Sequence, residues 1–320
     1  MSETGSFKVG VVGCGKVGMT AAFAMMLSGT PTDIVLVDRN KEKALGEKLD
    51  LEHAMSLMTN YVTVVGTDDY NELVGAKLIV YTAGISQIPG QTRLDLVNTN
   101  KKILEEILPK TNQAAPEAVI LIVANPVDVL TFWANRIITP PTPPQKPHPD
   151  PLLGKERGEI RVFGSGTMLD TARFRFHLSE LLRVNPHSIH AYVLGEHGDT
   201  SFPVYAKTTI GGQKLLDLPG INEEMIVDAY KKTRDAAYKI IEAKGATYYA
   251  IGVVVTKIMQ AIFSDSKTVY PLSVPLSGVA ISVPCVLGEN GVEKILEVDL
   301  SEAEKEKMRL SVEVLKPYCQ

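Results

Sequence analysis

The sequence predicts an α/β protein, with a doubly wound parallel sheet in its first half followed by an α+β domain. In the first half, short apolar runs alternate with segments of helix length, a pattern typical of a parallel sheet covered on both faces. A glycine-rich turn, GCGKVG, follows the first run and opens a helical pattern. The second half joins long helical patterns to neighbouring strand patterns without this alternation.

The first half supplies a series of expected strands and helices. The strands are residues 8–12, 34–37, 62–65, 78–83 and 119–124, and the helices are residues 17–28 and 41–58. Because these strand segments are largely apolar rather than alternating, we expect the strands to be buried on both faces.

A proline-rich segment separates the two halves. Residues 139–151 read TPPTPPQKPHPDP and contain seven prolines, so they form neither a helix nor a central strand. The segment is either a stiff linker or an insertion in a surface loop. We favour the insertion, because its flanks at 130–138 and 161–165 resemble parts of one sheet-and-helix unit. The expected domains are residues 1–160, with the insertion at about 139–159, and residues 161–320.

The second half begins with a strong helical pattern at residues 168–182. Strands are then expected at 189–194 and 208–210, helices at 223–243 and 248–263, and antiparallel strands at 269–276, 279–287 and 292–298. Ser277-Gly278 supplies a tight turn between the first two antiparallel strands. The last helix, 301–316, has Ser301 as its N-cap and Glu304 in position to complete a capping box.

The charge balance and the cysteines limit the class of protein. The 320 residues include 33 Lys and Arg against 37 Asp and Glu, a net charge of −4, and 45% apolar residues. This composition excludes a disordered chain and disfavours a nucleic-acid partner. Cys14, Cys285 and Cys319 are too scattered for a disulfide framework or a metal site, so we expect no metal. We find no secretory signal and no membrane span, and expect a cytoplasmic protein without a membrane partner.

The turn GCGKVG predicts a dinucleotide site through Gly13, Gly15 and Gly18. One glycine makes the tight turn, one lets the backbone approach a pyrophosphate, and one lets helix and strand pack closely. Lys16 and Val17 open the helix whose N-terminal amides hold the phosphate charge. The alternative, an ordinary glycine turn, is disfavoured by the strand before it and the helix after it.

An acidic residue refines the choice of dinucleotide. Asp38 ends the second expected strand, 20 residues after Gly18. A carboxylate there binds a ribose diol and repels a 2′-phosphate, which favours NAD over NADP. The neighbouring Arg39 slightly weakens that preference.

One helix carries charged side chains at a spacing that suits a site. Asp170 and Arg173 are three residues apart and share a face of the helix. Arg175 lies about 200° further around at ~100° per residue, so one arginine can face a site while the other faces outward. The alternative is an exposed ion pair between Asp170 and Arg173, and the spacing alone leaves both open.

Two loops carry further candidates. His197, in GEHGD, follows an apolar strand and lies between glycines, which suits proton transfer near neutral pH. Loop 85–97 contains Pro89 and Gly90 and could close as a lid that delivers Arg93. The alternatives are a structural or idle histidine and a plain surface loop.

Several motifs occur in the order of one family. They are GCGKVG, TAGISQIPGQTRLDLV, ANPVDV, GSGTMLDTARFRF, HAYVLGEHGDT and KGATYY. On these motifs, from about residue 8 to residue 316, the chain resembles the NAD-dependent lactate/malate dehydrogenase superfamily, and within it the bacterial allosteric L-lactate dehydrogenases. The resemblance implies a Rossmann sheet, a substrate domain, and the reversible NADH-dependent reduction of pyruvate to L-lactate.

The resemblance assigns a role to each catalytic candidate. His197 matches the proton donor and acceptor, and Asp170 the carboxylate that orients the imidazole and stabilises its charged form. Arg173 matches the residue that grips the substrate carboxylate with two parallel hydrogen bonds. Arg93 matches the residue that polarises the carbonyl, and Asn125 a hydrogen-bonding group near the reacting oxygen. The implied cofactor contacts are Gly13, Gly15, Lys16, Val17, Gly18, Asp38, Thr82, Ala83, Gly84, Asn100, Val123 and Asn125.

Two positions bear on the substrate. Gln87 matches the lid position at which malate enzymes carry arginine, and a neutral side chain there leaves the second carboxylate of oxaloacetate unpaired. Thr247 matches the position that limits the pocket and suits a small methyl group. We therefore favour pyruvate over oxaloacetate. A larger 2-oxo acid is a third possibility, because Ile88 makes the lid more apolar, and a catalytically silent NAD-binding scaffold is a fourth.

The resemblance also implies regulation and assembly. Arg175 and His190 match residues that bind fructose 1,6-bisphosphate between subunits of a homotetramer. Two places depart from the family. The proline-rich segment and the residues after it exceed the usual short loop, and we expect an exposed loop without a catalytic part. The connection at 274–281 is shorter than usual, which puts the tetramer in more doubt than the catalysis.

Overall fold

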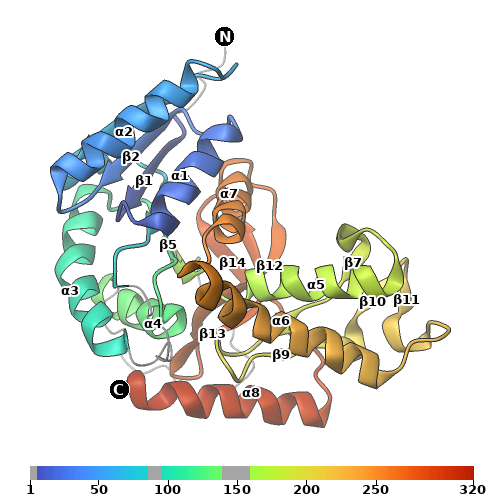
Figure 1. Cartoon of the computed structure of the whole chain (residues 1–320). Coiled ribbons are helices and arrows are strands. Elements are labelled where there is room, and N and C mark those ends of the chain that lie inside the picture. Colours follow the sequence, from blue (N-terminus) through green and yellow to red (C-terminus); the bar gives the residue numbers. More distant parts are fainter. Residues whose placement is uncertain (1–5, 86–95, 139–158) are drawn as a thin grey trace.

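The computed structural model describes residues 6–85, 96–138 and 159–320. The loop with Gln87, Ile88 and Arg93, and the proline-rich 139–151, lie outside these residues. A nine-stranded sheet contains strands from both halves of the chain (Figure 1). Its parallel strands are β1 (Lys8–Val12), β2 (Asp33–Val37), β3 (Thr63–Thr67), β4 (Leu78–Tyr81), β5 (Val119–Ile122) and β6 (Val162–Gly164). Their order, 3-2-1-4-5-6, is that of a Rossmann sheet, as the sequence predicts.

The strand order reverses beside β1. This strand pairs in parallel with β2 on one side and β4 on the other, so that Val12 lies opposite both Val37 and Tyr81. In sheets of this kind a crevice opens at the carboxyl ends of the strands at the reversal. The glycine turn directly follows β1 and Thr82 directly follows β4, so both lie at this crevice.

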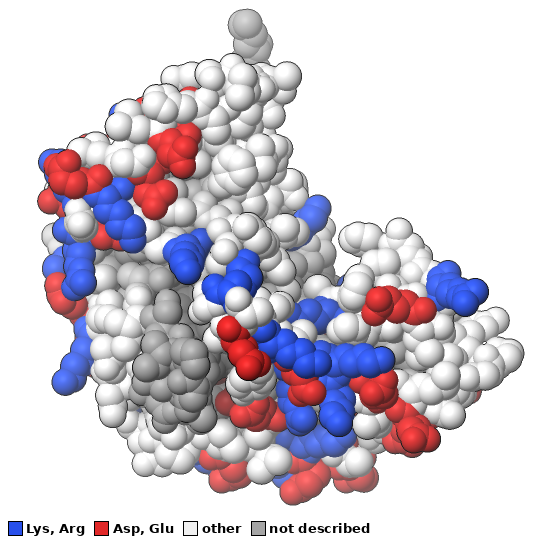
Figure 2. Space-filling view, viewed as in Figure 1, with Lys and Arg blue, Asp and Glu red and all other residues white. Residues whose placement is uncertain are grey.

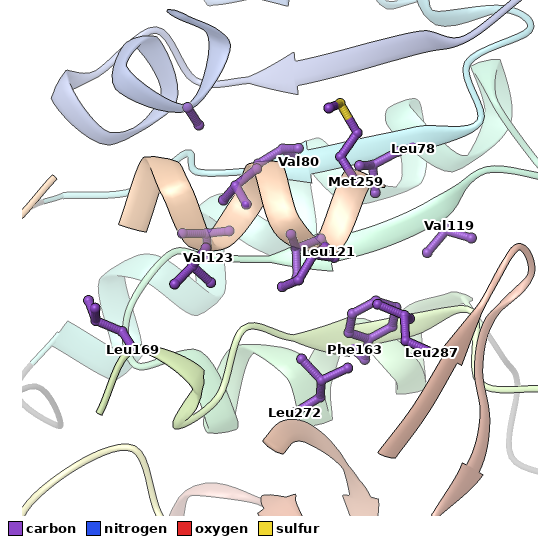
Figure 3. Packing of buried hydrophobic residues seen from close by; sticks show 14 of the residues in the cluster. Leu78, Val80, Val119, Leu121, Val123, Phe163, Leu169, Met259, Leu272 and Leu287 are labelled. Carbon is purple, nitrogen blue, oxygen red and sulfur yellow. The ribbon is translucent and has the colours of Figure 1, made fainter. Parts of the chain in front are cut away.

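Helices cover both faces of the sheet. The helices of the described residues are α1 (Lys16–Leu27), α2 (Lys41–Met55), α3 (Val97–Ala114), α4 (Val127–Ile138), α5 (Met168–Leu182), α6 (Glu223–Lys244), α7 (Tyr249–Phe263) and α8 (Glu302–Leu315), of which α6 packs against α5 rather than against the sheet. Successive residues of β4 point to opposite faces: Leu78 and Val80 enter one apolar core, and Ile79 and Tyr81 enter another. Figure 3 shows Met259 of α7 beside Leu78, so a helix of the second half covers the sheet of the first.

Three strands of the second half extend the same sheet. They are β12 (Thr268–Leu276), β13 (Val279–Gly288) and β14 (Gly291–Ile295). β12 joins β6 in antiparallel fashion, with Ser273 opposite Gly164. The tight turn at Ser277-Gly278 is confirmed: both residues have positive φ, 55° and 81°, as a two-residue hairpin turn requires. The division into domains at residue 160 stays a prediction.

The expected strand at 189–194 is wrong as a single element, because the chain breaks in its middle. β7 (Ile189–His190) pairs with β10 (Thr209–Ile210), whereas β8 (Val193–Leu194) pairs with β9 (Phe202–Pro203) in a different sheet. Between them, the Ala191 carbonyl accepts a hydrogen bond from a side chain, not from a strand. β11 (Gln213–Lys214) completes the sheet of β7 and β10. Short 3₁₀ helices lie at Tyr70–Leu73, Pro186–Ser188, Tyr205–Lys207, Leu215–Asp217 and Lys316–Tyr318.

The start of α8 follows the predicted capping box. The Ser301 hydroxyl accepts from the Glu304 N–H, and the Glu304 carboxylate accepts from the Ser301 N–H. A cap of this kind stabilises a helix by about 1 kcal/mol. In the parts of the chain that the structure describes, no helix is long and apolar enough to cross a membrane. Acidic and basic side chains are mixed over the face shown in Figure 2.

Candidate active site

Each glycine of the GCGKVG turn meets a different constraint. Gly13 has a φ of +104°, a conformation that suits only glycine. A Cβ on Gly18 would lie 2.0 Å from the Gly13 carbonyl oxygen, so a side chain there would push α1 away from the turn. A Cβ on Gly15 would meet no atom within 4 Å, so the space beside its backbone is open. The turn is therefore a cradle whose open side fits a diphosphate, with the N-terminal amides of α1 facing its charge.

Asp38 lies beside this cradle at the end of β2. One carboxylate oxygen accepts from the Cys14 N–H at 2.9 Å, and the other accepts from the Asn40 N–H at 2.9 Å. These bonds fix the carboxylate next to the turn, which is where a ribose diol of a bound dinucleotide would be recognised.

Thr82 joins the second wall of the crevice to the cradle. Its hydroxyl lies 2.8 Å from the Gly13 carbonyl oxygen and 3.1 Å from the Val12 carbonyl oxygen. The next residue, Ala83, packs so closely that a Cβ on Gly13 would lie 2.8 Å from its backbone nitrogen. These contacts hold the two predicted cofactor segments together.

A cavity of about 120 Å³ extends this crevice toward the second half of the chain. The predicted site residues that line it are Val17, Thr82, Gly84, Val123, Asn125 and Thr247. Asn125 Oδ1 is buried there and has no hydrogen-bond partner among the described residues. An unmade buried hydrogen bond costs about 1–3 kcal/mol, so a donor on a bound molecule fits this position. The residues present therefore fit a dinucleotide that extends from the cradle into the cavity.

Asn100, predicted as a cofactor contact, supports the cavity wall. Its side-chain oxygen accepts from the Ile85 N–H at 2.8 Å. Its side-chain nitrogen donates to the carbonyls of Ile85, at 3.2 Å, and of Asn125, at 2.7 Å. The whole carboxamide is thus engaged with backbone groups. Asn100 is buried, and its bonds fix Ile85 and Asn125, which both line the cavity.

His197 and Asp170 form a hydrogen-bonded pair. His197 Nδ1 lies 2.7 Å from one oxygen of the Asp170 carboxylate, and the other oxygen accepts from Arg173 at 3.1 Å. The exposed fractions of the three side chains are only 13–14%, so the alternative of an exposed ion pair is wrong. Because Nδ1 faces Asp170, Nε2 is the nitrogen left to exchange a proton with a substrate.

The sequence analysis missed Asp128, which accepts a hydrogen bond from the loop that carries His197. Its side chain is buried in the first turn of α4, three residues after Asn125. One carboxylate oxygen accepts from the His197 N–H at 2.6 Å and the other from the Ser273 hydroxyl at 2.5 Å. Burial raises the pKa of Asp128 to about 6, although these two hydrogen bonds and the nearby His197 favour the charged form. The aspartate in ANPVDV was the only signal for this role.

Helix α6 connects the cavity to the acid–base pair. A small hollow beside Asp170 and His197 is lined by Ala237, and the larger cavity is lined by Ile241, four residues later on α6. Four residues rise about 6 Å along a helix. The hollow beside Asp170 and His197 and the cavity that contains Asn125 and Thr247 are therefore lined by residues of α6 about one helical turn apart.

Arg175 is hydrogen-bonded to the residue that follows His190. Arg175 Nε donates to the Ala191 carbonyl at 2.9 Å, and His190 is the preceding, exposed residue. Arg175 is half-buried, and its guanidinium carbon lies 5.5 Å from the centre of the Tyr192 ring. Burial lowers its pKa below the usual range for arginine.

Two further predictions concern the lid and metals. Gln87 and Arg93 lie outside the described residues, so their places in the site stay predictions. Within residues 6–85, 96–138 and 159–320, no group of His, Cys, Asp and Glu side chains could hold a metal ion.

Comparisons with known proteins agree along the whole chain. Residues 7–142 match the lactate/malate dehydrogenase NAD-binding domain, and residues 167–319 match the lactate/malate dehydrogenase alpha/beta C-terminal domain. An L-lactate dehydrogenase of Thermoanaerobacterium saccharolyticum is 41% identical over 96% of each chain, and L-lactate dehydrogenase 1 of Bacillus cereus is 42% identical over 98% of each. The crystal structure of a minor L-lactate dehydrogenase from Enterococcus mundtii has a TM-score of 0.87 at 37% identity, and covers 99% of this chain and 98% of its own. The chain belongs to the lactate/malate dehydrogenase family.

Proposed function

We propose that the protein is an NAD-dependent L-lactate dehydrogenase that reversibly reduces pyruvate to L-lactate. The observation that carries this proposal is the partly buried His197–Asp170 pair with Arg173 bonded to the same carboxylate, beside a hollow that shares helix α6 with the dinucleotide cavity. Relatives that match this chain over nearly their full length at about 40% identity are L-lactate dehydrogenases.

Each residue of the site has a separate role in the reaction. When bound, NADH supplies the hydride that reaches the carbonyl carbon of pyruvate. His197 gives the proton to the carbonyl oxygen through Nε2, so that pyruvate, NADH and a proton become lactate and NAD. Asp170 stabilises the charged imidazole before this step. Arg173 holds the substrate carboxylate, and Arg93 is proposed to polarise the carbonyl.

The choice between pyruvate and oxaloacetate rests on Gln87. The experiment follows NADH oxidation with each substrate, in the natural protein and in the Gln87→Arg variant. We expect kcat/KM to favour pyruvate by about tenfold or more, and the variant to shift the preference toward oxaloacetate, because arginine pairs the second carboxylate. A preference of the natural protein for oxaloacetate would show that Gln87 does not decide specificity. Activity on neither substrate would favour a larger 2-oxo acid or a silent scaffold.

We also propose fructose 1,6-bisphosphate as an activator that binds at Arg175 and His190. The bond from the Arg175 guanidinium to the carbonyl of Ala191, the residue directly after His190, supports a shared anion site. The test measures pyruvate reduction at low pyruvate over a wide range of bisphosphate. We expect the bisphosphate to activate the natural protein and to activate the His190→Gln variant less, since the variant changes an exposed side chain of the proposed site. Unchanged kinetics in the natural protein would refute the proposal.

We also propose that the protein is a homotetramer and that it works in the cytoplasm. Exposed apolar side chains on α2, beyond its end and on α7, namely Leu49, Leu57 and Val253, support an assembled state. The cysteines are free thiols, as a reducing compartment favours. Sedimentation with and without the bisphosphate should give a mass about four times the 34.8 kDa of the chain. A monomer under both conditions would contradict this assembly.

A further inference from the structure

Two lysines adjoin residues that line the dinucleotide cavity, one in each half of the chain. Lys16 is the first residue of α1, and the next residue, Val17, lines the cavity. Lys244 is the last residue of α6, and the residues directly after it, 245–247, line the same cavity. Each lysine is therefore next in sequence to residues of the cavity wall.

The packing of α1 against α7 brings these edges together. A Cβ on Gly252 of α7 would lie 2.9 Å from the Thr20 side chain of α1, so the two helices touch here. Thr20 is one turn after Lys16, and Gly252 is one turn after Tyr248, the N-cap of α7. Lys16 and Tyr248 thus lie at the same end of two adjoining helices. Figure 2 shows basic side chains on this part of the surface, between α1 and the end of α6.

Lys244 rests on an aromatic shelf formed by Tyr248 and Tyr249. Its ammonium lies 3.4 Å from the centre of the Tyr248 ring and 3.9 Å from that of Tyr249. The two ring centres are 4.7 Å apart. Lys244 and, more weakly, Lys16 lower the pKa of the Tyr248 phenol, in keeping with two positive charges close to this hydroxyl. The shelf holds the charge of Lys244 in place by cation–π attraction.

These two charges are available to an anion. Among the described residues, neither Lys16 nor Lys244 forms a salt bridge with a carboxylate. The whole chain has a net charge of −4, so a dinucleotide approaches a molecule of like sign. A local pair of cations at the mouth of the cleft offsets this repulsion and attracts the diphosphate.

We propose that Lys244 and Tyr248 bind the diphosphate of the dinucleotide from the side of the cleft opposite the glycine cradle, with Lys16 on the cradle side. The two ammonium groups match the two negative charges of a diphosphate. Because the shelf orients Lys244 before binding, less conformational freedom is lost when the cofactor arrives. The proposal rests on NAD as cofactor and adds Lys244 and Tyr248 to its binding residues.

The test compares Lys244→Met with Lys239→Met, which removes an exposed lysine from the same helix. Dissociation constants are measured for NADH and for ADP-ribose, which has the diphosphate but no nicotinamide, over a range of salt. We expect Lys244→Met to bind both about tenfold more weakly at low salt, equivalent to about 1.4 kcal/mol, with a smaller difference at high salt. Lys244→Arg, which keeps the charge, should restore most of the affinity, and Lys239→Met should bind as the natural protein does.

Three results would overturn the proposal. They are unchanged binding in Lys244→Met, an equal loss in Lys239→Met, and a loss for NADH without a loss for ADP-ribose, which would place Lys244 at the nicotinamide end. The thermal midpoint of each variant separates lost binding from lost folding. Because the assay uses the cofactor alone, it remains readable even if the chain reduces no pyruvate.

Discussion

Asp128 accepts a 2.6 Å hydrogen bond from the backbone N–H of His197, sixty-nine residues later in the chain. The same carboxylate accepts from Ser273 on β12, so one buried group ties α4, the catalytic loop and the antiparallel strands together. A buried carboxylate is costly unless it is hydrogen-bonded, and here each oxygen has a donor. The position of His197, the proposed proton donor, therefore depends on a residue that need not touch the substrate.

Replacing Asp128 by asparagine should change how stability depends on pH. The pKa of Asp128 is raised to about 6 in the folded chain, against about 3.9 when unfolded, so the folded state binds the extra proton between these values. Its contribution to stability is thus largest below pH 4 and is lost as pH rises through 6. Asparagine removes this loss while it can still accept from His197 and donate to Ser273. Between pH 4 and 7 the natural protein should lose about 2 kcal/mol relative to Asp128→Asn.

Urea unfolding of both proteins at several pH values measures this difference. All other titrating groups are shared, so they cancel in the comparison. Parallel stability curves over pH 4 to 7 would show that Asp128 does not titrate in this range.

Asp170→Asn should weaken catalysis without weakening the binding of NADH. Asparagine cannot stabilise the charged imidazole of His197, so we expect kcat/KM for pyruvate to fall by about 10²- to 10⁴-fold. Helix α5 offers a matched control, because Glu180 lies 3.1 Å from His177 in a similar carboxylate–imidazole pair at the surface. Steady-state kinetics and NADH titrations should show that Glu180→Gln keeps the kcat/KM and the NADH affinity of the natural protein. Equal losses in the two variants would mean that the helix, not the pair, is responsible.

Alanine at Gly15 and at Gly18 should separate cofactor binding from folding. The Cβ of Gly15→Ala meets no protein atom within 4 Å, so the protein should fold with unchanged stability. The same methyl group would occupy the open side of the cradle, and NADH should bind at least about tenfold more weakly. In Gly18→Ala the methyl would lie 2.0 Å from a carbonyl oxygen, so stability itself should fall. Thermal unfolding and NADH titration distinguish the two, and normal NADH binding by Gly15→Ala would disprove the cradle.

The thiols should resist alkylation in the folded protein. Burial raises the pKa values of Cys14, Cys285 and Cys319 to about 12, far above the usual value of about 8.5, and the reactive form is the thiolate. Iodoacetamide at pH 8 should therefore label none of them in the native state and all three in denaturant, as counted by mass spectrometry. Rapid labelling of Cys14 would instead reveal an accessible thiol within the cofactor cradle.

Local patterns in the sequence predicted much of this structure. The glycine turn, the helix Met168–Leu182, the Ser277-Gly278 turn and the Ser301 capping box each depend on residues close together in the chain, and each is confirmed. Features that depend on distant contacts were missed. The apolar run 189–194 shows no sign of the break at Ala191, because the Arg175 bond that accompanies it comes from another helix.

In the candidate site, too, residues in local motifs were predicted and contacts between distant residues were missed. His197, Asp170 and Arg173 were identified from motifs, and the structure brings them together. Asn100 and Asp128 act through backbone groups 15 to 69 residues away, which no local pattern reveals. An aspartate in the first turn of a helix is also favoured by the helix dipole alone, so Asp128 had an ordinary explanation.

Strand β6 lies between β5 and β12 in the sheet, so a break in the chain before β6 would separate strands that pair. β6 follows the proline-rich segment in sequence, yet it completes the parallel sheet of the preceding half and joins β12 on its other edge. A chain cut between α4 and β6 would give an amino-terminal fragment without its sixth strand and a carboxy-terminal fragment with that strand's edge uncovered. Neither fragment could bury its own surface, but together they would restore every strand pairing. The two halves should thus behave as complementary pieces of a split enzyme, inactive apart and active when co-expressed.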